Sequence, residues 1–243
     1  MTPKINFRSV RVIAVVGAGA LAASVAVAIP LASHAAHANH PAPAPVAAPA
    51  SPSPQPGDSG PIALVSGVRW MGGLALGYPD TRSGVLSAGL EYTTAYVECL
   101  DPARLRAIAQ DIAAPGEKIG ADAAAVTKSD RALAGAPASG PLPAGTALVL
   151  TGRMYQLLDF AQGRARLLLL FTMAATGPSA PDLSGKVLGL PVELTWAEGD
   201  WKLAEWDGGP SYHKLIAPPD SSAAYDAGWL DLPSAGDGPG SWS

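Results

Sequence analysis

The first 61 residues most constrain what this chain of 243 residues can fold into. Lys4, Arg8 and Arg11 precede a run of 20 uncharged, mostly apolar residues, from Val12 to Leu31. A basic start followed by such a run is typical of a segment that directs the rest of a chain across a membrane. Residues 39–61 are rich in Pro and Ala, a composition that cannot bury a core. Once the Gly/Ser/Pro-rich tail is also set aside, roughly 170 residues remain, which suits one domain.

Two interpretations of the leader, residues 1–38, stay open. Its apolar run can span ~30 Å of hydrocarbon at ~1.5 Å per residue, which predicts a signal anchor and a single-pass protein of the cell membrane. The run is also rich in Ala and Gly, contains Pro30 and is followed by Ala36-His37-Ala38, a small-x-small pattern of the kind that signal peptidase cuts. That pattern predicts a secreted protein, cleaved near Ala38. Either way, the positive-inside rule places the N-terminus in the cytoplasm and the domain outside.

The linker, residues 39–61, predicts a semi-rigid spacer, because its Pro-Ala and Ser-Pro repeats favour extended polyproline geometry. Such a spacer would hold the domain off the membrane or carry it into the cell wall. A proline-rich ligand for a partner is the alternative, although no Lys or Arg flanks the prolines to orient binding.

The chain beyond the leader is acidic. After the first forty residues, 13 Lys and Arg stand against 20 Asp and Glu, a net charge of −7 compared with −4 for the whole chain. An acidic domain repels a phosphate backbone, and no cluster of basic residues follows Arg11. Direct binding of DNA or RNA is therefore not expected.

Cys99 is the only cysteine, so an intramolecular disulfide is excluded. No cysteine follows the apolar run directly, which excludes a lipoprotein anchor. We interpret Cys99 as a small apolar residue packed on a helix, because no neighbouring His or Lys would activate it. A reactive thiol or an intermolecular bridge is the alternative.

Helices are expected first. Residues 77–87 predict a loop that ends with Asp80, Thr81 or Ser83 as the N-cap of a long helix. The apolar residues of that helix recur at helical spacing and form a wide face, which predicts packing against a sheet. They are Leu86, Ala88, Leu90, Tyr92, Ala95, Val97, Cys99 and Leu100.

Two further helices are expected before the sheet. Asp101-Pro102 pairs a capping residue with a proline at the first helical position, and Leu105, Ile108 and Ile112 then line one face of a helix that stops before Pro115. A third, short helix is predicted from Ala121 to Leu133.

Antiparallel strands are expected after the helices. Apolar runs separated by Gly, Pro and Asp predict strands at Thr146–Leu150, Arg153–Phe160, Arg164–Met173 and Val187–Trp206. The last run contains a hairpin that turns at Glu198-Gly199-Asp200. Its tryptophans, Trp196, Trp201 and Trp206, are interpreted as cross-strand packing, with a ligand-stacking wall as the alternative. Because successive side chains of a strand point to opposite faces, Trp206 is expected on the opposite face from Trp201.

Helices followed by an antiparallel sheet predict an α+β domain over residues 62–232, with the N-terminal helices packed on a curved sheet in a cone-shaped fold. Residues 233–243 predict a disordered tail.

Motifs for metal or cofactor binding are absent. Beyond the leader and the linker, His213 is the only histidine, and we interpret it as a surface-loop residue. A metal site or a Cys–His pair would need Cys99 and His213 to converge from distant parts of the chain. No calcium-binding Asp spacing and no dinucleotide-binding glycine motif is present. We therefore predict no metal ligand, no cofactor and no cofactor-binding residue.

Burial in the cavity of a cone can shift the pKa of a carboxylate or a tyrosine enough for acid–base chemistry. Tyr155, Asp159 and Glu193 are conceivable members of such a site. Acidic residues on strands more often face water, so we predict no catalytic residue and no enzymatic activity.

Two stretches carry a resemblance to known proteins. The first is Gly-Tyr-Pro-Asp-Thr-Arg-Ser-Gly-Val-Leu, residues 77–86; the second is Leu-Thr-Trp-Ala-Glu-Gly-Asp-Trp-Lys-Leu, residues 194–203, followed by Gly209-Pro210. Together they resemble exported or single-pass actinobacterial proteins that carry Pro-x-Thr-x-x-Gly-Ala ahead of a helix and Trp-x-x-Gly-Asp-Trp-Lys-Leu near the end. The resemblance covers roughly residues 65–215.

Proteins of that group are associated with plasmids and integrative conjugative elements, and look like extracytoplasmic domains of the nuclear transport factor 2-like fold. In type IV secretion scaffolds of this kind, the resemblance implies a domain that assembles with partners around a DNA-transfer channel without enzymatic activity.

These observations predict a membrane-tethered, non-enzymatic assembly domain of a cell-envelope complex, including one that serves conjugation. Its partners would be other envelope proteins, the membrane through the N-terminal segment, and further copies of the chain. The alternative is a secreted small-molecule binder or isomerase-like enzyme that uses the cavity of the cone.

Overall fold

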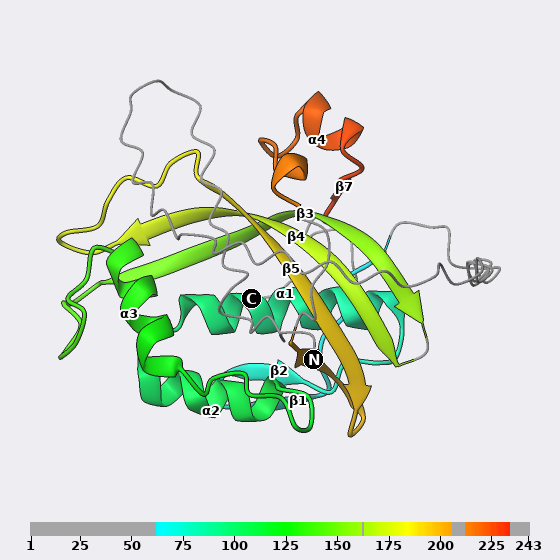
Figure 1. Cartoon of the computed structure of the whole chain (residues 1–243), viewed down its shortest axis with the longest axis horizontal. Coiled ribbons are helices and arrows are strands. Elements are labelled where there is room, and N and C mark those ends of the chain that lie inside the picture. The colour runs from blue at the N-terminus through cyan, green and yellow to red at the C-terminus, as the bar shows by residue number, and fades with distance from the viewer. Residues whose placement is uncertain (1–61, 162, 206–211, 234–243) are drawn as a thin grey trace, which may run out of the picture. The chain divides into compact units, whose positions relative to one another are not determined.

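A computed structural model describes residues 62–161, 163–205 and 212–233 (Figure 1). The leader (1–38), the linker (39–61), Trp206 and residues 234–243 of the expected tail lie outside the described residues. The predictions made for those segments therefore stay predictions.

The described residues form helices, strands and one short 3-10 helix. In chain order they are β1 (Arg69–Met71), β2 (Leu74–Leu76), α1 (Arg82–Glu98), α2 (Pro102–Ile112), α3 (Ala123–Leu133), β3 (Ala147–Ala161), β4 (Arg164–Thr176), β5 (Val187–Ala197), β6 (Asp200–Ala204), η2 (His213–Leu215), α4 (Ser222–Asp226) and β7 (Leu230–Asp231). The three long helices precede the main sheet, so the predicted α+β class is confirmed.

The main sheet has five strands in the order β6-β5-β4-β3-β7. Every pair in it is antiparallel, and β3 to β6 follow one another as consecutive hairpin-connected strands. A separate hairpin of β1 and β2 precedes the helices. Figure 1 shows α1 lying across one face of the sheet, and α1 contacts β3, β4, β5 and β6.

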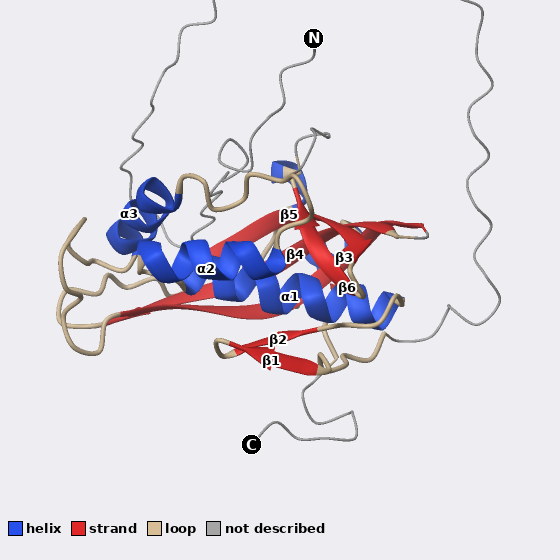
Figure 2. Cartoon of the chain, turned by 90° about the horizontal axis from the view of Figure 1, so that it is seen from below, coloured by secondary structure: helices blue, strands red, loops and turns tan. Residues whose placement is uncertain are grey.

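Helix α1 is covered on more than one side. Besides the sheet it contacts α2 and β2, which lie on its other sides (Figure 2). Its buried residues include Leu86, Tyr92 and Tyr96, which do not share a single narrow stripe. A helix that is buried all round carries apolar residues all round. The wide apolar face in the sequence therefore reflects two covering layers, whereas the sequence predicted a sheet alone.

The start of α1 depends on two residues of the first motif. Thr81 is the N-cap, and its hydroxyl oxygen accepts a hydrogen bond from the Gly84 N–H at 3.0 Å. A Cβ at Gly84 would lie 1.9 Å from the carbonyl oxygen of Pro79. Glycine is the residue that fits there, because every other side chain begins with that carbon atom.

The two short strands predicted at Thr146–Leu150 and Arg153–Phe160 are one strand, β3. The register against β4 shifts between Gly152 and Met154, which is a β-bulge. A bulge inserts one residue without ending the ladder, so the glycine that suggested a break between two strands marks an irregularity inside one.

The predicted hairpin is present as β5 and β6, with a tighter turn than expected. Ala197 pairs with Asp200, so the turn consists of Glu198 and Gly199, with φ angles of 56° and 75°. Positive φ at both positions is the requirement of a type I′ turn. Asp200 is consequently the first residue of β6 and not part of the turn.

A second, smaller core lies on the face of the sheet opposite α1. Leu168 and Leu170 of β4 pack there with Met154, Val187, Ala224 and Trp229. Trp229 is 2% exposed, and its Nε1–H donates to the Leu215 carbonyl at 2.7 Å. The segment that contains η2, α4 and β7 thus covers this face, although the sequence analysis predicted neither α4 nor β7.

Candidate functional site

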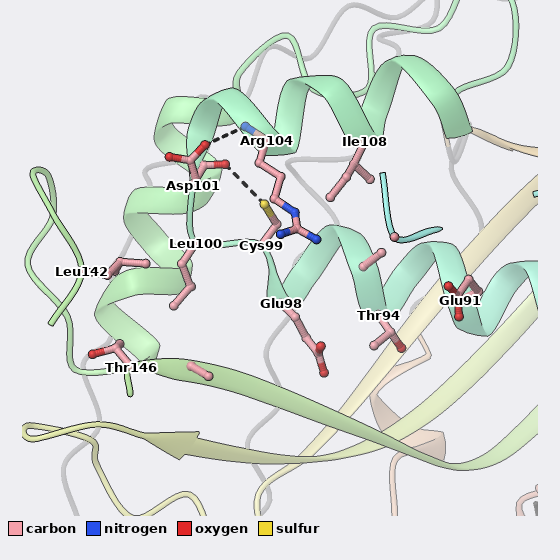
Figure 3. Close-up of a pocket in the computed structure, with 13 residues that line it drawn as sticks. Glu91, Thr94, Glu98, Cys99, Leu100, Asp101, Arg104, Ile108, Leu142 and Thr146 are labelled. Atoms are coloured by element: carbon pink, nitrogen blue, oxygen red, sulfur yellow. Dashed lines mark hydrogen bonds between the residues drawn. The ribbon is translucent and has the colours of Figure 1, made fainter. Parts of the chain in front are cut away.

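A pocket of about 520 Å³ opens between the end of α1, the beginning of α2 and the start of β3 (Figure 3). The tight turn between β1 and β2 reaches it through Gly73. Its lining mixes apolar and charged side chains. The lining residues are Gly73, Glu91, Thr94, Ala95, Glu98, Cys99, Leu100, Asp101, Arg104, Ile108, Leu142, Thr146 and Ala147.

Two carboxylates of this pocket come from one helix. Glu91 and Glu98 are seven residues apart on α1, which is about two turns and places them on the same face. The Ala75 N–H donates to Glu91 Oε1 at 3.4 Å, and the Leu150 N–H donates to Glu98 Oε1 at 2.6 Å. Backbone groups from β2 and β3 therefore hold each carboxylate in place.

The surroundings of Glu98 disfavour its charged form. Burial raises the pKa of Glu98, the hydrogen bond from Leu150 opposes the rise, and the nearby negative charge of Glu91 adds to it. A half-buried carboxylate in this setting is stabilised by any cation that approaches it.

The beginning of α2 supplies the remaining charges. The carboxylate of Asp101 accepts a hydrogen bond from the Arg104 N–H at 2.7 Å and caps the helix, as predicted. The Arg104 guanidinium extends from α2 toward α1 and lies near the backbone of Gly73 (Figure 3). Glu91, Glu98, Asp101 and Arg104 are the charged residues that line the pocket, so its charged side chains carry a net charge of −2.

Cys99 lines the pocket but is 7% exposed. Burial raises the pKa of its thiol, and its Sγ lies 3.3 Å from the Asp101 carbonyl oxygen, to which it donates. Because the thiolate is the nucleophilic form, this environment disfavours a reactive cysteine. The structure is in line with the apolar packing role proposed for Cys99.

Apolar side chains are exposed on and beside β1, next to the pocket. Val68, Trp70 and Met71 are 80%, 66% and 50% exposed. We call these three residues the β1 surface. Figure 2 shows β1 on the outer side of β2, away from α1. All three residues of β2 are buried, so the hairpin has one strand in the core and one in solvent.

A further carboxylate, Asp200, lies beside α1. It is fully buried, whereas Glu91 and Glu98 are partly exposed. The Tyr92 hydroxyl donates to its two oxygens at 2.9 and 2.8 Å, the Tyr78 N–H donates to Oδ1 at 2.9 Å, and Lys202 Nζ lies 3.5 Å from Oδ2. We call these four residues the Asp200 network. Burial, followed by the bond to Asp200, raises the pKa of Tyr92 far above its usual range.

The Asp200 network joins the two motifs of the resemblance. Besides the bond from Tyr78 to Asp200, the Trp201 Nε1–H donates to the Pro79 carbonyl at 2.8 Å. The Pro79 carbonyl is the same group that excludes a side chain at Gly84. The loop before α1 and the turn before β6 are therefore one structural unit.

The three residues considered for acid–base chemistry do not converge. Tyr155 and Leu169 are cross-strand partners, and Tyr155 belongs to the large core on the α1 side, whereas Asp159 is exposed. Glu193 is 4% exposed and accepts hydrogen bonds from Arg164 Nε at 2.8 Å and Arg166 Nε at 3.1 Å. Paired with two guanidinium groups, Glu193 is an ion-pair residue of the sheet.

The tryptophans Trp196 and Trp201 are a cross-strand pair whose ring centroids lie 5.5 Å apart. Phe160 packs on Trp201 at 6.0 Å. This arrangement matches the interpretation as cross-strand packing. His213 is exposed in η2, as expected of a surface residue, although β7 follows it in the chain.

Of the charged residues that line the pocket, Glu91, Glu98 and Arg104 were not singled out in the sequence. The spacing of Glu91 and Glu98 is the signal that was available, because it puts two acids on one face of a helix that is otherwise mostly apolar. Asp101 was recognised as a cap only, and nothing in the sequence places Arg104 next to α1.

Comparisons of this chain with models of protein families, with curated proteins and with solved structures found no match. In the described part of the chain, no group of three or more His, Cys, Asp or Glu residues could hold a metal ion. None of the helices in the same part is long and apolar enough to cross a bilayer.

Proposed function

We propose that this protein is a membrane-tethered, extracytoplasmic assembly domain that contributes protein–protein contacts to a cell-envelope complex. The observation that carries the proposal is the β1 surface, where Val68, Trp70 and Met71 expose apolar side chains on a strand at the edge of the domain. Exposed apolar surface of this kind is typical of interaction sites. The leader and the linker, as predicted from sequence, would present this domain outside the cytoplasm.

The contact between the two motifs supports the resemblance at the level of the fold. Residues that are 122 positions apart, Tyr78 and Asp200, meet in one hydrogen bond. Proteins that carry both motifs would then share this contact between the loop before α1 and the start of β6. On this basis we propose the nuclear transport factor 2-like cone as the fold and a conjugative or type IV secretion scaffold as the class of complex.

The proposal is tested with the full chain carrying a C-terminal tag. Fractionation and intact mass show whether the leader is retained in the membrane or removed near Ala38. Cross-linking in cells, followed by recovery of the tag, should yield the same envelope proteins in repeated experiments. If no envelope protein is recovered, and deletion of the gene leaves DNA transfer unchanged, the proposal fails.

A second function is favoured by the pocket. A volume of about 520 Å³ with mixed lining suits a small molecule, as in a secreted binder or an isomerase-like enzyme. That function predicts stabilisation by ~2.7 kcal/mol at a ligand concentration a hundredfold above Kd. A flat melting response over a panel of small apolar and cationic compounds would exclude it.

A further inference from the structure

We infer that the β1 surface and the acidic pocket bind one extended segment of an envelope partner, in which apolar residues alternate with Lys or Arg. This inference rests on the proposed function and names the site and the chemistry of the partner. It is carried by a strand edge, by exposed apolar side chains and by the charge of the pocket.

The free edge of β1 is the first feature that supports the inference. Within the described residues, β1 pairs with β2 alone, and all three of its residues are exposed. The edges of the main sheet are treated differently. The segment just after α2 covers β6, where the Ala114 N–H donates to the Leu203 carbonyl at 2.8 Å, and the other edge is β7, a strand of only two residues. An uncovered edge is a template for an added strand, whose backbone supplies the affinity.

The composition of the edge is the second argument. Natural proteins blunt exposed edges with proline, with charges or with a covering segment. The strand β1 begins with one such charge, Arg69, but Trp70 and Met71 beside it offer apolar area to a neighbour. Tryptophan is among the residues that most often contribute the binding energy of an interface. An added strand with apolar side chains would bury this area.

The pocket lies next to the turn that ends β1, which is the third feature that supports the inference. Gly73, in the turn that ends β1, is a lining residue of the pocket. A segment that pairs with β1 and continues past this turn therefore reaches the pocket. The pocket is large enough for a long side chain, and an extended chain of a few residues covers ~3.3 Å per residue.

The negative charge of the pocket favours a basic partner. The pocket has three carboxylates and one guanidinium, and the chain beyond its first forty residues carries a net charge of −7. Because Glu91 and Glu98 are already fixed by backbone N–H groups, an incoming cation does not have to order them. A Lys or Arg side chain suits this site, whereas an acidic segment would be repelled. Burial raises the pKa of Glu98, and a nearby cation would favour its charged form.

The test uses the purified full chain and two capped octapeptides, one alternating Lys with Val and the other Glu with Val, in titration calorimetry. We expect the Lys peptide to bind with a Kd of ~1 mM or tighter and the Glu peptide not to bind. Added salt should weaken the binding, because charges contribute to it. Equal binding of the two peptides, or no binding of either, overturns the inference.

Variants assign the binding to the site. Glu91→Gln combined with Glu98→Gln removes two charges and leaves Gln oxygens that accept the same backbone hydrogen bonds. Trp70→Ser removes the apolar anchor. Each should weaken the Lys peptide about tenfold, whereas Leu230→Ser, at a residue with a similar exposure of 54% on β7, should not change it. Unchanged binding in the first two variants overturns the inference.

The same variants separate this inference from the proposed function. If the wild-type chain cross-links to envelope proteins and the Trp70→Ser and Glu91→Gln/Glu98→Gln chains do so equally well, the proposed function stands and the site is wrong. If the wild-type chain cross-links to none, the proposed function fails. Sedimentation that shows a dimer lost in Trp70→Ser identifies the occupant as a second copy, and overturns the choice of a basic partner.

Discussion

Carboxylates lie both on α1 and beside it, and their surroundings differ. Asp200 is fully buried and is satisfied by a tyrosine hydroxyl, a backbone N–H and a lysine. Glu91 and Glu98 are partly exposed, and the hydrogen bonds described for them come from one backbone N–H each. A carboxylate oxygen accepts about two hydrogen bonds, so the pair on α1 keeps capacity for a further donor.

The two sets of carboxylates also differ in how visible they are in the sequence. Three of the four residues of the Asp200 network, all but Tyr92, lie in the motifs that stand out in the sequence, and its groups contact one another. The acidic pocket carries no motif, but its charges face an open volume. The motif residues therefore stabilise the packing of this domain, whereas carboxylates outside the motifs line its pocket.

The largest effect is expected from Asp200→Ala. The change leaves the Tyr92 hydroxyl buried without its acceptor and the Lys202 ammonium, which also donates to the Asp111 carbonyl, buried without its counter-charge. Removal of one partner of a buried ion pair typically costs ~3–5 kcal/mol. Chemical denaturation of the purified chain measures the loss. Asp159→Ala, at an exposed carboxylate, is the matched control and should shift the midpoint little. Similar losses in the two variants would remove the distinction drawn for Asp200.

Gly84→Ala is expected to act next. Its Cβ would lie 1.9 Å from the Pro79 carbonyl oxygen, so the loop of the first motif must move, at ~1–3 kcal/mol. Gly89→Ala in the same helix is the control, because its Cβ would meet a flexible Leu167 methyl at 2.8 Å. Thermal or urea unfolding should rank Gly84→Ala as the more destabilised. The reverse order would show that the loop at Pro79 yields easily.

A smaller effect is expected from Glu98→Gln, and it depends on pH. Burial raises the pKa of Glu98 above the ordinary 4.5, so just above pH 4.5 the folded chain binds more protons there than the unfolded chain. Stability from this residue then falls as the pH rises through that window. Glu98→Gln should flatten this part of the stability–pH profile, measured by urea midpoints at a series of pH values. An unchanged slope in Glu98→Gln would mean that Glu98 is hydrated like an ordinary surface acid.

The smallest effect on stability is expected from Trp70→Ser. A side chain that is 66% exposed contributes little to the core, so the free energy of unfolding should change by no more than ~0.5 kcal/mol. Urea denaturation checks this, with Leu230→Ser alongside. A large loss would place Trp70 with the Asp200 network as a structural residue and would weaken the case for the β1 surface.

Local signals in the sequence were enough for much of the fold. Asp101 and Pro102 mark the start of α2, and Glu198-Gly199 marks the hairpin turn, because capping and turn chemistry act over a few residues. The bulge at Gly152 was misread as a break, since a glycine between apolar runs has the same appearance in both cases.

Very short strands, and the pocket, were missed. The strands β1 and β7 have three and two residues, too few for a periodic pattern, and exist because β2 and β3 pair with them. The pocket combines side chains of α1 and α2 with the turn at Gly73, and only the packing of these elements brings them together.

The hydrogen bond from Tyr78 to Asp200 spans 122 residues of chain. In a protein that is delivered progressively from its N-terminus, the helices emerge well before β6, and the loop ahead of α1 has no carboxylate to close on until then. Contacts of such long range slow folding, because a large loop must close before they form. Completion of the domain is therefore coupled to arrival of the chain beyond Asp200, so a product truncated before β6 leaves α1 without its anchor and open to proteolysis.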